Sequence, residues 1–190
     1  MAVLLSVPLV FALTGCGQGG PSTGSDGTNP APSTSPLPPR PAVLRLDAVN
    51  PCTLLSSTQL GQLGIRQGEF SRDEDSSHDA LCHWDNYPER PSMRYVARLQ
   101  VQQGADYALG STTGHQLVQI DGFPAVQTTS EGQDPATHCI LVVDVAADQS
   151  LWVQYNNAFG DYQGLTHEQS CQFVRAFGED LMQNLQTQAR

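Results

Sequence analysis

Four widely spaced cysteines constrain the fold of this chain more than any other feature of its sequence. Cys52, Cys82, Cys139 and Cys171 are separated by 30, 57 and 32 residues. A structural zinc site usually takes its ligands in close pairs such as C-x2-C, and this spacing offers none. An even number of cysteines favours disulfide bonds when a domain is exported. We therefore expect two disulfides and no metal site formed by these cysteines.

The N-terminus carries the pattern of a bacterial lipoprotein signal. An apolar run of 11 residues, 3–13, leads into Leu13-Thr14-Gly15-Cys16. The run is too short for the ~20 residues of a membrane-spanning helix, whereas its length and the small residues before Cys16 fit a secretory signal. We expect residues 1–15 to be a signal peptide and Cys16 to carry lipid. The lipid would anchor the protein on the outer face of the cell membrane.

A segment of low complexity follows Cys16. Of the 25 residues 17–41, 19 are Gly, Pro, Ser or Thr. Such a segment cannot bury enough apolar surface to offset the entropy lost on ordering. We expect residues 16–42 to be the lipidated cysteine and a disordered tether, and residues 43–190 to be a single extracytoplasmic domain.

The charge of the chain excludes several classes of function. The formal net charge is −10, and all nine basic residues are arginines. A nucleic-acid-binding protein would show a basic patch, so we expect no nucleic-acid partner. Anionic headgroups would repel the domain, so the membrane contact would come from the lipid. The absence of lysine excludes Schiff-base chemistry and a Walker A site, and nothing in the chain predicts a cofactor.

Capping signals predict helices at both ends of the domain. Asn50 precedes Pro51 as a helix cap, and Ser57 is expected to cap a short helix over residues 58–63 that ends at Gly64. Thr166 is followed three residues later by Gln169, as in a capping box that begins a long helix. Its apolar residues recur at helical spacing: Val174, Phe177, Leu181 and Leu185.

The segment between these helices predicts strands. Asp121-Gly122 is a two-residue turn signal for a hairpin. Pro124 cannot donate to a strand ladder, so we expect its strand at a sheet edge. The fold class is therefore α+β, an antiparallel sheet packed against a long C-terminal helix and a short N-terminal helix. The expected strands are residues 80–86, 93–102, 117–120, 123–128, 138–146 and 150–156.

Several short motifs together resemble a known family. They are Asn50-Pro51-Cys52-Thr53-Leu54-Leu55, Cys82-His83-Trp84, Ile120-Asp121-Gly122-Phe123-Pro124-Ala125, Cys139 and the helix that holds Cys171. With these motifs the chain resembles an actinobacterial lipoprotein family catalogued as domain of unknown function three-five-five-eight. The similarity covers about residues 48–185, the lipid-attachment motif and the tether. It implies localisation and architecture, because the family carries no established activity.

The expected topology also selects one disulfide pairing. The hairpin that starts at His138 returns by Asn156 beside its own start, and the long helix begins shortly afterwards at Thr166. Cys171 would then lie about one helical turn from that end of the hairpin. We therefore pair Cys139 with Cys171, which leaves Cys52 with Cys82 by default.

Signatures of catalysis and of metal binding are weak. The chain has neither G-x-S-x-G nor H-E-x-x-H, although a Ser-His-Asp triad assembled from distant positions stays open. Acidic and hydroxyl residues alternate over 73–79 as in a calcium loop, but His78 and Trp84 stand where that loop needs Gly and Glu. We expect a solvated acidic loop, five surface histidines and no metal site.

Aromatic residues beside amides offer the remaining candidate site. Such residues form shallow grooves for a sugar or a lipid headgroup, and they also serve as core or cross-strand pairs. Our leading hypothesis is a non-enzymatic module that binds an envelope protein or a small ligand outside the cell. The alternatives are a carrier or sensor of a small envelope lipid or glycan, and an exported hydrolase. The candidate ligand-binding residues are Trp84, Tyr87, Trp152, Tyr155, Asn156 and Tyr162.

Overall fold

A computed structural model of the chain describes residues 36–74, 77–111, 114–157 and 159–189. The predicted signal peptide, Cys16 and the tether up to residue 35 lie outside the described residues, as does part of the acidic loop. Within the described ranges, no helix is both long enough and apolar enough to cross a membrane.

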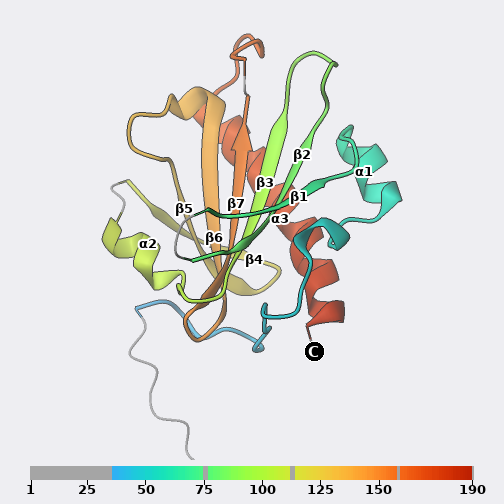
Figure 1. Ribbon diagram of the computed structural model, residues 1–190. Coiled ribbons are helices and arrows are strands. Elements are labelled where there is room, and N and C mark those ends of the chain that lie inside the picture. The colour runs from blue at the N-terminus through green and yellow to red at the C-terminus, as the bar shows by residue number, and fades with distance from the viewer. Residues whose placement is uncertain (1–35, 75–76, 112–113, 158, 190) are drawn as a thin grey trace, which may run out of the picture. The chain divides into compact units, whose positions relative to one another are not determined.

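The described chain forms an antiparallel sheet of seven strands (Figure 1). The strands follow the order β1-β2-β3-β7-β6-β5-β4, so two meanders join where β3 meets β7. With the long helix at the C-terminus, this confirms the α+β class. The strands are β1 (Glu69–Arg72), β2 (Ala80–Asp85), β3 (Arg94–Gln100), β4 (Gln116–Ile120), β5 (Phe123–Thr128), β6 (His138–Ala146) and β7 (Gln149–Asn156).

The helices α1 and α3 begin at or within one residue of the predicted caps. Thr166 and Gln169 form the predicted capping box of α3. The cap of α1 is Ser56 rather than Ser57, because Gln59 stands three residues after Ser56 and closes the box there. Gly64 ends α1 at φ 65°, in the left-handed region that glycine adopts readily. The helical elements are η1 (Pro51–Thr53), α1 (Ser57–Leu63), α2 (Asp106–Ser111), η2 (Pro135–Thr137) and α3 (His167–Gln188).

The main core lies between α3 and one face of the sheet, which we call the helix face (Figure 1). Strand alternation places Leu151, Val153 and Tyr155 of β7 on this face, all fully buried. Phe177 of α3 stacks on Tyr95 at 4.4 Å between ring centroids. It also meets Trp84 edge-to-face at 5.3 Å. The predicted stripe of α3 is confirmed, since its four residues are fully buried.

The opposite face of the sheet, the outer face, is covered only in part. A second and smaller apolar cluster lies there, and α2 contributes Ala108 to it. Neither α2 nor β1 was predicted, because six and four residues are too few to establish a periodicity. The cluster consists of Leu37, Ala105, Ala108, Val126, Ile140 and Val142.

The expectation that the strand with Pro124 lies at a sheet edge is wrong. This strand, β5, lies between β4 and β6. Its pairing with β6 begins only at Ala125, and Pro124 is paired with Gln119 of β4 alone. The missing N–H therefore does not interrupt the ladder between β5 and β6.

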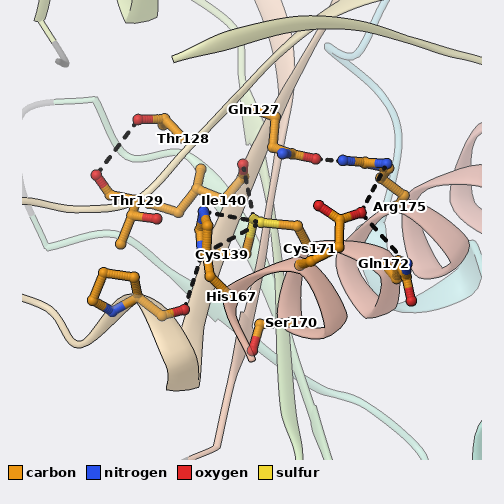
Figure 2. The surroundings of a disulfide bond; sticks show 12 residues. Gln127, Thr128, Thr129, Cys139, Ile140, His167, Ser170, Cys171, Gln172 and Arg175 are labelled. Atoms are coloured by element: carbon orange, nitrogen blue, oxygen red, sulfur yellow. Dashed lines mark hydrogen bonds and ion pairs between the residues drawn. A yellow bond between two sulfur atoms is a disulfide. The ribbon is translucent and has the colours of Figure 1, made fainter. Parts of the chain in front are cut away.

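Both predicted disulfides are confirmed. Cys52 of η1 is bonded to Cys82 of β2, with Cα atoms 5.2 Å apart. Cys139 of β6 is bonded to Cys171 of α3, with Cα atoms 5.1 Å apart. Figure 2 shows the second bond at the start of α3, beside His167. One disulfide thus fastens the N-terminal turn to the sheet, and the other fastens the C-terminal helix to it.

Candidate functional site

Two of the six candidate ligand-binding residues lie in the core. Trp84 is 1% exposed and Tyr155 is fully buried, both on the helix face beneath α3. Burial raises the pKa of the Tyr155 hydroxyl to about 12. The expectation that these two rings line a surface groove is wrong, because strand alternation directs them to the same face as their apolar neighbours.

The other four candidates do not share one groove. Tyr87 lines a cavity of 220 Å³ that also contains Arg94 and Phe159. Tyr162 lines a separate, open hollow beside Asp161. Trp152 and Asn156 are both half-buried on the outer face of β7, and Trp152 lines a pocket there.

The pocket at Trp152, which we call the outer-face pocket, has a volume of about 230 Å³. Its floor is aliphatic, formed by Ile140 and Val142 of β6 together with Ala108 of α2. Its polar and aromatic lining consists of Gln100, Gln103, Tyr107, Thr128, Ser130 and Trp152. The pocket therefore lies where α2 leaves the outer face of the sheet uncovered.

Strand register explains how this lining assembles. Trp152 of β7 is paired with Val142 of β6 on one side and with Arg98 of β3 on the other. Thr128 of β5 is paired with Ile140 of β6. Directly opposed residues in antiparallel strands have their Cβ atoms about 4.5–5.5 Å apart. The aromatic wall and the aliphatic floor are thus neighbours on a single surface.

Buried hydrogen bonds hold the amide side of the pocket. The hydroxyl oxygen of Ser150, which is fully buried, lies 2.8 Å from Gln100 Oε1 and 2.8 Å from the backbone oxygen of Gln103. Gln100 itself is only 6% exposed. Because a hydroxyl carries one proton, Ser150 can donate to only one of these two oxygens at a time. The Gln100 amide is thus held beside Ser150 at the edge of the pocket.

Trp152 is supported from outside the pocket. The guanidinium carbon of Arg98 lies 5.5 Å from the centroid of the Trp152 ring, in cation–π geometry. Arg98 is in turn paired with Asp73, with N and O atoms 2.7 Å apart. Arg98 does not line the pocket. The tryptophan is therefore backed by an ion pair that leaves the pocket itself without charge.

A hydrogen-bonded serine and histidine do occur in the described residues, but they do not form a Ser-His-Asp triad. Ser71 Oγ lies 3.1 Å from His83 Nε2, across β1 and β2. Burial and then Arg94 lower the pKa of His83. Glu69 is paired with His83 in register and is exposed, but in the described residues no carboxylate is hydrogen-bonded to His83. The pair lacks the acid that orients a catalytic histidine.

The expectation of five surface histidines is wrong at His138. Its side chain is 3% exposed, and neither ring nitrogen has a hydrogen-bond partner among the described residues. Burial and then His167 lower its pKa, which favours the neutral ring. The described ranges also contain no cluster of three His, Cys, Asp or Glu residues able to hold a metal ion.

Comparison with known proteins gives a family and no relative of known function. The family described as protein of unknown function (DUF3558) matches residues 11–184 of the chain. No curated protein and no solved structure matches the chain.

Proposed function

This chain belongs to the DUF3558 family, and we propose that it is a lipid-anchored, non-enzymatic module that binds a small ligand on the outer face of the cell membrane. The observation that carries the proposal is the outer-face pocket, in which Trp152 stands over an aliphatic floor among fixed polar groups. Small-ligand sites are typically concave and apolar, with a few oriented polar groups.

Two features support the location outside the cell. Disulfides persist in oxidising compartments, and this domain holds two. The Leu13-Thr14-Gly15-Cys16 motif supplies the lipid attachment point. The domain carries a strongly negative net charge, so the acyl chains would provide the membrane affinity.

The composition of the pocket supports binding rather than catalysis. In the part of the chain that the structure describes, its lining offers hydroxyls from Thr128 and Ser130 but no histidine and no carboxylate. A hydroxyl nucleophile needs such a base within hydrogen-bond reach. The pocket can therefore orient a ligand through hydrogen bonds, but its own side chains cannot activate a hydroxyl.

Loss of the lipid should release the protein from the membrane. In the native host, the Cys16→Ala variant should move from the membrane fraction to the soluble fraction, because no thiol remains to be acylated. Ser22→Ala, in the same N-terminal segment, should stay with the membrane and serves as the control. A Cys16→Ala protein that remains on the membrane after a high-salt wash would contradict the anchor.

Ligand binding should shield Trp152 from a quencher. The chain has two tryptophans, so Trp84→Phe leaves Trp152 as the only one. We expect the dialysable fraction of an envelope extract to reduce acrylamide quenching of this variant. Trp152→Phe retains the buried Trp84, and its quenching should not respond. If Trp84→Phe folds poorly, the quenching of Trp152 is obtained instead by subtracting the quenching of Trp152→Phe from that of the wild type. Equal quenching with and without extract would contradict the proposal.

A further inference from the structure

We propose that the ligand of the outer-face pocket is an uncharged carbohydrate, with one sugar ring lying against the indole of Trp152. This inference rests on the proposed function and names the class of molecule that the site takes. It follows from three properties of the pocket, namely its aromatic wall, its hydrogen-bonding groups and its lack of charge.

The aromatic wall is suited to the apolar face of a sugar. An indole ring presents a negative π-face, which attracts the polarised C–H groups on one side of a pyranose. Trp152 is held for this role before any ligand arrives, because Arg98 backs its ring and Asp73 holds Arg98. A preorganised wall loses little side-chain entropy on binding.

The polar groups match hydroxyls rather than ions. Amides and hydroxyls both donate and accept hydrogen bonds, as every sugar hydroxyl does. The Gln100 amide lines the pocket and is held by Ser150 at 2.8 Å. Thr128 is only 4% exposed, and its hydroxyl makes a long contact of 3.5 Å with the backbone oxygen of Thr129. Poorly satisfied groups in a buried position favour a ligand that supplies hydrogen bonds.

The lack of charge excludes ionic ligands. Among the described residues, no arginine, histidine or carboxylate lines the pocket, although the domain around it is acidic. An anion would be desolvated there without a counter-charge, and a cation would find no carboxylate. The guanidinium of Arg98, which lies over the Trp152 ring, is already paired with Asp73. A neutral ligand does not have to be desolvated as an ion, so the lack of a counter-charge in the pocket does not weaken its binding.

The dimensions fit one ring of a longer molecule. Sites for drug-sized ligands have volumes of roughly 300–1,000 Å³, and this pocket has about 230 Å³. Tyr107 on α2 is 61% exposed at the rim, where it can contact the next residue of a glycan. The pocket therefore suits a single sugar unit that extends into solvent.

The test compares neutral sugars with charged sugars of similar size and with a flat aromatic compound. The full chain, purified in detergent, is titrated with glucose, galactose and mannose, with glucuronate and glucosamine as charged counterparts, and with adenosine as a flat aromatic ring. The readouts are acrylamide quenching of Trp152 and isothermal calorimetry. We expect at least one neutral sugar to bind, and its charged counterparts to bind at least tenfold more weakly. Tighter binding of glucuronate, glucosamine or adenosine would overturn the inference.

Matched variants locate the binding. Tyr107→Ala removes an exposed ring, so it should fold, and it should weaken neutral-sugar binding several-fold. Gln100→Leu should weaken it about tenfold, because a sugar hydroxyl then meets an apolar group. Tyr87→Ala, in the separate cavity with Arg94, should change nothing. Unchanged binding in both pocket variants would overturn the inference. If the envelope extract protects Trp152 while no sugar does, the binding function stands and the carbohydrate inference fails.

Discussion

Reduction of both disulfides should leave the domain barely folded at 25 °C. The two bonds join residues 30 and 32 positions apart. Loops of this length give about 3.7 kcal/mol of stabilisation each in the chain-entropy model. Because the free energy of unfolding of a typical domain is roughly 5–15 kcal/mol, losing both removes a large part of it.

Urea unfolding of the oxidised and the reduced, alkylated protein measures this loss. Two paired variants each remove one disulfide: Cys52→Ala/Cys82→Ala and Cys139→Ala/Cys171→Ala. Each should lower the free energy of unfolding by about half as much as the reduction of both disulfides does. Reductant should have no effect on a variant that lacks all four cysteines. Equal unfolding midpoints for oxidised and reduced wild-type protein would contradict the prediction. A linked Cys52–Cys171 peptide in a non-reduced digest would contradict the pairing.

The predictable parts of this fold are those specified by local sequence. Asp121-Gly122 forms its turn because both residues have positive φ, 51° and 83°. The capping box at Thr166 fixes the start of α3 in the same local way. The disulfide pairing could also be predicted, because it depends only on where a hairpin ends and a helix begins.

The outer-face pocket could not be predicted, because it depends on contacts between distant segments. It needs β3 beside β7, which no local signal specifies, and it needs α2, whose six residues show no clear periodicity. Alternation in β7 carried a usable signal, since Trp152 lies out of phase with its apolar neighbours Leu151 and Val153. The same alternation places Tyr155 in phase with them, and hence in the core.

Phe177→Ala should destabilise the domain by about 3–5 kcal/mol, the usual range for deleting a buried phenylalanine side chain. Phe177 is fully buried, and its ring contacts both Tyr95 and Trp84. Removing it leaves a cavity where α3 packs against Trp84 of β2 and Tyr95 of β3. Urea unfolding, followed by circular dichroism, measures the change in the free energy of unfolding.

Phe173→Ala is the matched control on the same helix. Its ring is only partly buried and contacts Tyr155 and Tyr162, so the expected loss is smaller, about 1–2 kcal/mol. A loss at Phe173 equal to or greater than that at Phe177 would contradict the arrangement of the core. At urea concentrations below its unfolding midpoint, the Phe177→Ala variant should still bind ligand, and the ligand should still protect Trp152 from acrylamide quenching. Phe177 packs on the helix face and Trp152 lines the outer face, so the substitution should lower stability without altering the pocket.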